Sequence, residues 1–216
     1  MKKIFWKIAS LIGAAVIIAI IAIRIYKVNA SVVPTEQADY GVGDEIVLGD
    51  NFLVSRSDCD WSDYSVKIEG YELLTYSEYL KKYNYTEDPG NPLISSEESL
   101  YPEMIYDLDI TFRNLNDQEG SGSGIDLIPY KLYGTDFQME FSDELYYLSN
   151  PGMEDIGFRF ALRPGTSKTF HIPFFFQPSA ASGAVSVEKT LQDDLYLMIS
   201  EYPVRNLIHL RGEEHQ

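Results

Sequence analysis

The sequence predicts an all-β protein, an antiparallel β-sandwich preceded by one N-terminal transmembrane helix. Three observations lead to this prediction. The first 30 residues contain an apolar run with lysines before it. Beyond residue 40, apolar and polar residues alternate in short segments, which is the pattern of half-buried strands. Turn residues separate these segments, and no long amphipathic pattern lies among them, so strands packed in two layers are favoured.

The predicted helix comes first in the chain. Residues 8–23 (IASLIGAAVIIAIIAI) carry no charge, and three lysines precede them. By the positive-inside rule the lysines place the N-terminus in the cytoplasm and the rest of the chain outside. Counted from Ile4 to Tyr26, the segment would be about 34 Å long at about 1.5 Å per residue, enough for a hydrocarbon core of about 30 Å. We therefore expect a cytoplasmic stub over residues 1–7 and a transmembrane helix or signal anchor over residues 8–27.

A cleaved signal peptide is the alternative to an anchor. The tripeptide Val28-Asn29-Ala30 offers the small residues that cleavage after Ala30 requires. Two basic residues lie between the apolar run and that site, where signal peptides are usually neutral, so the anchor is favoured. Residues 28–40 are polar and aperiodic, which predicts a linker, and residues 41–216 are expected to form the extracytoplasmic domain.

Alternation is clearest over Met104–Arg113, where a helix would scatter acidic residues onto the apolar face. The same period of two recurs over Phe170–Phe176, Leu195–Ile199 and Leu207–Arg211. Further strands are expected over shorter segments: Glu45–Leu48, Asn51–Ser55, Tyr64–Leu74, Ile125–Leu132, Phe137–Phe141 and Gly157–Leu162. A short helix is expected over Ser77–Tyr83 and a long loop over Asn84–Ser99.

Four stretches of the domain resemble a family of exported immunoglobulin-like, telokin-like domains of Gram-positive bacteria, most of them of unknown function. They are Tyr40-Gly41-Val42-Gly43-Asp44-Glu45-Ile46, Phe112-Arg113-Asn114, the turn Leu162–Ser167 running into Thr169–Phe176, and the closing pair Leu195–Ile199 and Asn206–Leu210. The resemblance spans about residues 40–211 and implies an immunoglobulin-like β-sandwich and an exported location. It implies no catalytic residues. Members commonly follow a lipoprotein signal, whereas this chain has no cysteine just after its apolar run.

The charge is unevenly placed along the chain. The 17 basic and 33 acidic residues give a net charge of −16. Residues 1–30 hold five basic residues and no acid, which leaves a net charge of −21 for the remainder. Such an acidic domain is a poor nucleic-acid binder, because neutralising phosphates needs clustered Lys and Arg. The single cysteine excludes an internal disulfide framework and a cysteine-rich zinc site.

No catalytic constellation stands out, so we expect a protein that is not an enzyme and needs no cofactor. His171, His209 and His215 are the only imidazole bases, and the first two fall in strand patterns where an outward-facing histidine is the ordinary explanation. The sequence contains no G-x-S-x-G, H-E-x-x-H or phosphate-binding glycine motif. A hydrolase that uses paired carboxylates stays open as an alternative, although 33 acids make any chosen pair meaningless.

Calcium is the metal that the sequence makes worth considering. Asp58, Asp60 and Asp63 form D-x-D-x-x-D, and calcium prefers several oxygen ligands on a turn. The motif lacks the glycine and closing glutamate of an EF-hand, so a solvated loop is favoured over a calcium site. Cys59 lies between two of these carboxylates, which raise a thiol pKa and disfavour a reactive thiolate.

Tyrosines carry the strongest suggestion of binding. Seven of the 16 tyrosines lie between residues 71 and 106, interspersed with acids. Tyrosine offers a large amphipathic contact area at low entropic cost, and recognition surfaces favour it. Tyr79, Tyr83 and Tyr85 are the candidate binding residues, with packing against the domain as the alternative.

The sequence thus predicts a single-pass protein of the cell membrane with a cytoplasmic N-terminus and an extracytoplasmic domain. Its role would be protein or ligand interaction at the cell envelope. The expected partners are the membrane, through the N-terminal helix, and an envelope protein or basic partner, with no nucleic acid. A carboxylate-based envelope hydrolase and a calcium-stabilised structural domain are the alternatives.

Overall fold

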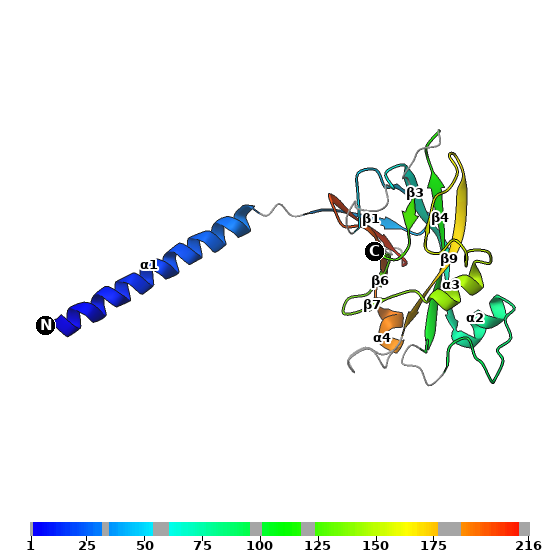
Figure 1. Cartoon of the computed structure of the whole chain (residues 1–216), viewed down its shortest axis with the longest axis horizontal. Coiled ribbons are helices and arrows are strands. Elements are labelled where there is room, and N and C mark those ends of the chain that lie inside the picture. Colours follow the sequence, from blue (N-terminus) through cyan, green and yellow to red (C-terminus); the bar gives the residue numbers. More distant parts are fainter. Residues whose placement is uncertain are drawn as a thin grey trace, which may run out of the picture. The chain divides into compact units, whose positions relative to one another are not determined.

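The computed structural model describes residues 2–31, 35–53, 61–95, 101–117, 124–176 and 187–211 (Figure 1). In the N-terminal helix, side chains are described at residue 13 and at residues 15–29. The chain divides into two compact units, Met1–Thr35 and Glu36–Gln216.

The first unit consists of one helix, α1 (Lys2–Ser31). It includes residues 2–7 of the predicted stub. It also runs into the start of the predicted linker, because no glycine or proline interrupts the chain between Gly13 and Pro34. Within the part of the chain that the structure describes, no helix is both long enough and apolar enough to cross a membrane.

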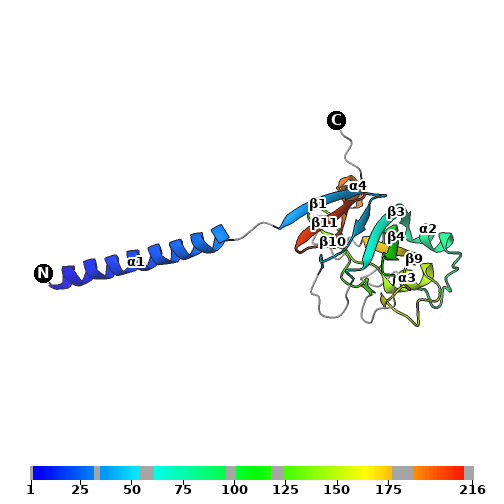
Figure 2. The ribbon, with the colours of Figure 1, turned by 90° about the horizontal axis from the view of Figure 1, so that it is seen from above.

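The second unit is built on two main sheets (Figure 2). The first has the order β1 (Glu36–Gly41), β11 (Val204–His209), β10 (Tyr196–Ser200), β6 (Leu132–Tyr133), β7 (Gln138–Met139). The second has the order β2 (Glu45–Val47), β3 (Tyr64–Thr75), β4 (Met104–Asn114), β9 (Ser167–Phe176). A small separate pair joins β5 (Ile125–Asp126) to β8 (Arg159–Phe160). The predicted β-sandwich is confirmed.

The β1 strand corrects two predictions. It occupies residues 36–40, the last five of the segment that was predicted to be linker over residues 28–40. It pairs with β11 in parallel, from Glu36 opposite Val204 to Gly41 opposite His209. The sandwich is therefore not wholly antiparallel. The polar sequence of β1 hides the strand, because this edge strand has few buried side chains and is held by backbone pairing.

The core lies between the two sheets and follows the predicted alternation of β4. Leu108, Ile110 and Phe112 are fully or almost fully buried. Ile110 lies opposite Phe170 of β9, and Leu108 lies opposite Ile172. The intervening side chains of β4 point to the outer face of the sheet, where burial depends on what covers that face.

Two short helices cover part of that outer face (Figures 1 and 2). The α2 helix (Tyr76–Lys82) confirms the predicted helix with a shift of one residue, because Thr75 forms a capping box with Glu78. The α3 helix (Asp143–Ser149), capped by Ser142, was not predicted, nor was α4 (Val187–Gln192).

Beneath the two helices lies a second apolar cluster, separate from the core between the sheets. Its buried members are Tyr76, Tyr79, Leu80, Ile94, Ile105 and Leu145. It joins α2 and α3 to one end of β4 and β9, and so gives the sandwich a third layer at that end.

The shorter predicted strands have mixed outcomes. Asn51–Ser55 forms only an isolated bridge, from Phe52 to Tyr202, in its described part. Ile125–Leu132 is a strand only at its two ends, because residues 128–129 form a turn between β5 and β6, closed by the Tyr130 N–H donating to the Leu127 carbonyl. The predicted loop over Asn84–Ser99 has no helix or strand longer than a single bridge as far as residue 95, where the described stretch ends.

Candidate functional site

Two cavities border the same short segment, residues 140–143, which leads from β7 to α3. The larger has a volume of about 460 Å³ and the smaller about 240 Å³. Glu140, Phe141 and Asp143 line both. Together with the side chains around them, we take these cavities as the candidate functional site and call them the paired cavities.

The segment is held in place because it crosses from one sheet to the other. Met139 of β7 lies opposite Leu132 in the first sheet. Phe141, two residues on, forms a bridge with Phe174 of β9 in the second sheet. The Phe175 N–H donates to the Glu140 carbonyl at 3.1 Å. Backbone pairing on both sides thus fixes the position of the side chains between the cavities.

The larger cavity has an apolar wall. Ile128, Tyr130, Phe141 and Phe158 contribute to it. Ile128 is 55% exposed, although it is a large apolar side chain. The rings of Phe141 and Phe158 meet edge to face with centroids 5.2 Å apart. This cavity therefore offers apolar surface to whatever enters it.

Charged side chains surround this apolar wall. The Lys131 ammonium lies 2.7 Å from a Glu140 carboxylate oxygen. Asp143 is exposed and makes no ion pair or hydrogen bond with the described residues. Glu140 is thus neutralised by a neighbour, whereas the Asp143 charge faces solvent.

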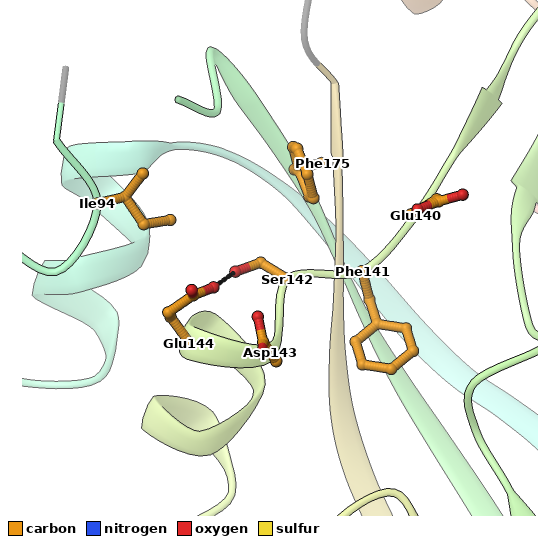
Figure 3. Close-up of a pocket in the computed structure, with 7 residues that line it drawn as sticks. All are labelled: Ile94, Glu140, Phe141, Ser142, Asp143, Glu144 and Phe175. Carbon is orange, nitrogen blue, oxygen red and sulfur yellow. Dashed lines mark hydrogen bonds between the residues drawn. The ribbon is translucent and has the colours of Figure 1, made fainter. Parts of the chain in front are cut away.

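The smaller cavity lies between Ile94, Phe175 and the start of α3 (Figure 3). The Ser142 hydroxyl donates to the Glu144 carboxylate at 2.8 Å and accepts from the Leu145 N–H at 3.3 Å, as a helix cap does. Figure 3 shows Glu144 and Ser142 facing the same space as Ile94, while the ring of Phe141 points away from it. The polar groups here thus serve the start of the helix.

The three predicted binding tyrosines are elsewhere, at α2 and its C-terminal end. Tyr79 is fully buried, and its hydroxyl donates to the Leu145 carbonyl at 3.0 Å. Tyr83 and Tyr85 are half-buried and pack against the second cluster. The prediction that Tyr79 is a surface binding residue is therefore wrong, because α2 turns this side chain toward the sheet.

Tyr83 belongs to a polar group of its own around Asp107 on β4. The Asp107 side chain is fully buried. One of its oxygens accepts from the Tyr83 hydroxyl at 2.6 Å and from the Lys82 ammonium at 2.8 Å, and the other has no hydrogen-bond partner among the described residues. Burial, with the neighbouring Asp107, raises the pKa of Tyr83 well above its ordinary value. The arrangement ties α2 to the sheet and holds no activated nucleophile.

The histidines of the strands both pair with carboxylates. His171 lies opposite Asp109, with 2.6 Å between Nδ1 and the carboxylate, and its ring meets Tyr83 edge to face. His209 lies between Asp194 at 2.9 Å and Asp39 at 3.0 Å. Burial opposes the charged form of His209, but hydrogen bonds to both carboxylates outweigh it and raise its pKa.

The predicted calcium ligands are described only in part. Asp58 and Asp60 lie outside the described residues, as does Cys59. Asp63 accepts from the Asn116 side-chain amide at 2.6 Å. Among the residues that the structure describes, no group of three or more His, Cys, Asp or Glu side chains could hold a metal ion.

Comparison with known proteins gives a family without an assigned function. One solved structure that resembles the chain is an uncharacterized β-sandwich protein from Clostridium difficile 630, with 10% sequence identity and a TM-score of 0.38, over 84% of this chain and all of that one. No curated protein matches. The telokin-like family that the sequence resembles is not confirmed by these comparisons. The profile of the family "Domain of unknown function (DUF5028)" matches residues 37–206, most of the chain, and the chain therefore belongs to that family.

Proposed function

We propose that this protein is a membrane-anchored, extracytoplasmic β-sandwich module that binds a protein or ligand at the cell envelope and catalyses no reaction. The observation that carries the binding role is the paired cavities, where an apolar wall with one exposed member, Ile128, lies beside the exposed carboxylate of Asp143. The anchor and the location rest on the N-terminal helix and on the distribution of charge along the chain.

Support for the anchor comes from α1. Eight large aliphatic side chains in its second half are each between 53% and 66% exposed: Val16, Ile17, Ile18, Ile20, Ile21, Ile23, Ile25 and Val28. With the exposed Ala19 and Ala22 they place apolar surface on every side of the helix. A helix that is apolar on all sides is stable only when something apolar surrounds it. The uncharged run over residues 8–23 begins before the described side chains do, and a bilayer is the environment that suits the whole run.

Support for the extracytoplasmic location comes from charge. Lysines precede the apolar run, whereas the remainder of the chain has a net charge of −21. The lysines favour a cytoplasmic N-terminus. Anionic lipid headgroups would repel the acidic domain, so solvent, cations and basic partners are its favoured neighbours.

Support for binding comes from the size and lining of the larger cavity. At about 460 Å³ it falls within the range of about 300–1,000 Å³ that is usual for ligand sites. Exposed large apolar side chains beside a cavity are typical of interaction surfaces. The segment of residues 140–143 that lines this cavity is held by backbone pairing to both sheets, so this part of the site is preformed.

A site-specific crosslink in cells tests the binding role. We expect a photo-crosslinking amino acid at Ile128 to yield a discrete adduct. The matched control is the same amino acid at Leu115, another exposed aliphatic residue. Leu115 follows the end of β4 that pairs with Ser167, the far end of β9 from Phe175. Equal crosslinking from both positions, or from neither, would argue against a binding site at the cavities.

The smaller cavity is the one feature that favours the alternative of a carboxylate-based hydrolase. Glu140, Asp143 and Glu144 all line it. Two of these carboxylates already have partners, in Lys131 and Ser142, and at about 240 Å³ the cavity is below the usual size of a ligand site. We therefore rank hydrolysis second. The ranking would be reversed if the purified chain hydrolysed envelope glycans and Asp143→Asn abolished that activity.

A further inference from the structure

We propose that the larger cavity receives a cationic segment of the partner, in which a large apolar side chain lies close in sequence to a lysine or arginine. This inference rests on the proposed binding role and adds the chemistry of what is bound. The apolar side chain would lie against Ile128, Phe141 and Phe158, and the cation beside Asp143.

The apolar part of the proposal follows from unequal burial along one wall. Tyr130 is almost fully buried and belongs to the core, whereas Ile128, two residues before it, is 55% exposed. Phe141 and Phe158 are half-buried next to it. An apolar side chain placed here would cover surface that the domain leaves in water, and removing it from water favours binding.

The cationic part follows from which charges already have partners. Lys131 and Glu140 neutralise each other at 2.7 Å at the rim of the cavity. Asp143 is left without a cationic partner among the described residues, in a domain that is strongly acidic as a whole. An incoming cation gains from both the local carboxylate and the field of the domain, whereas an anion is repelled by both.

The two parts lie at one place because Phe141 and Asp143 are two residues apart on a segment fixed to both sheets. An apolar side chain and a cation can therefore be bound together when they are close in the partner's sequence.

Peptide selection tests the proposal. The full chain in zwitterionic nanodiscs is used to select from a phage-displayed library of random dodecapeptides. We expect enriched peptides with a large apolar residue within three positions of lysine or arginine. Their binding should fall about tenfold on each of two changes. Asp143→Lys places a cation where the peptide's own cation is expected, and Ile128→Lys places a cation where its apolar side chain is expected. It should also weaken as salt rises.

Matched controls make the same charge changes at the other end of the sheet. Leu115→Lys and Asp117→Lys alter an exposed aliphatic residue and an exposed acid next to the end of β4. Peptide binding to these variants should stay within about twofold of the parent chain. Circular dichroism of each variant shows whether it folds, and Ile128→Ser serves as a milder second variant at the cavity.

Three results would overturn the proposal. Enriched peptides that are acidic or uncharged would exclude a cationic partner. Equal binding to the parent, Ile128→Lys and Asp143→Lys would place binding elsewhere. If the chain self-associates and Ile128→Lys abolishes the self-association, the cavity binds a second copy of the chain. A crosslinked partner from Ile128 in cells, combined with any of these results, would leave the proposed binding role standing and refute only the cationic, apolar chemistry of the bound segment.

Discussion

Replacing Lys82 by methionine should destabilise the domain far more than the same replacement of an ordinary surface lysine. The Lys82 ammonium lies 2.8 Å from Asp107, whose side chain is fully buried. Removing one partner of a buried ion pair costs about 3–5 kcal/mol, because the remaining charge stays in the interior. Lys82 is 26% exposed, and Tyr83 would still donate to Asp107 at 2.6 Å in the variant. We therefore expect a loss of stability below that range or at its lower end, about 2–3 kcal/mol.

Lys131→Met is the matched control. Lys131 is 28% exposed, close to Lys82, and its carboxylate partner is equally near at 2.7 Å. The difference is the partner, because Glu140 is 65% exposed and water can solvate it once the lysine is gone. Exposed pairs of this kind contribute about 0.2–1 kcal/mol. The main difference between the two variants is therefore the burial of the acid. Lys82 also has a second partner in Glu72 at 3.1 Å, but that carboxylate is 58% exposed and adds little.

Guanidinium denaturation followed by circular dichroism measures both variants. The melting temperature gives a second readout, at about 2–4 °C per kcal/mol for a chain of this size. The double variant Lys82→Met/Asp107→Asn should recover much of the loss, because it removes the buried charge and keeps an acceptor for Tyr83. A Lys82→Met variant no less stable than Lys131→Met would refute the view that this pair fastens α2 to the sheet.

Three further predictions follow from other parts of the domain. Because the pKa of His209 is raised in the folded state, its stabilising contribution is complete below about pH 6.5 and is lost as pH rises through the folded-state pKa. Chemical denaturation at stepped pH should therefore show the free energy of unfolding fall over this range, and His209→Gln should remove the fall. Phe174→Ala should cost about 3–5 kcal/mol in the same assay, because this side chain is fully buried between the sheets. A chelator should leave the thermal melt unchanged, since Asp63 already accepts a hydrogen bond from Asn116; a lower melting temperature would revive a calcium site.

The strands that were predictable are those whose side chains alternate between the core and the outer face. β4 carries this alternation over Met104–Arg113 and β9 over Phe170–Phe176, and the structure has both strands where the pattern indicates. β1 was not predictable because a polar edge strand leaves no such pattern, and its partner β11 lies more than 150 residues away. Only the folded chain brings the two together.

The α3 helix was not predicted, although its signals are present in the sequence. Ser142 is followed by two acids and an apolar run, as at a capped helix start, and Asn150-Pro151-Gly152 ends the pattern. The apolar segment Phe137–Phe141, which predicts a strand, runs directly into this helix start and hides the boundary between the two. The capping residues at 142–144 thus mark the start of α3 even though an apolar strand, and not a loop, comes directly before them.

The candidate site was the least predictable feature. The lining of the larger cavity comes from the turn after β5, the segment before α3 and the turn before β8, and no spacing in the sequence joins them. The tyrosines that suggested a surface are amphipathic residues that α2 packs onto the sheet. A count of tyrosines cannot distinguish a binding surface from internal packing, because both need the same aromatic ring and hydroxyl group.

The central claim is that an acidic β-sandwich is displayed outside the cell on a membrane anchor, and protease treatment of intact cells tests it most directly. Cells expressing the chain with a C-terminal tag are exposed to an external protease and then fractionated. We predict that the untreated chain stays with membranes after an alkaline wash and that the protease removes the tag. A chain that is recovered in the cytosolic fraction with its tag protected would contradict the claim.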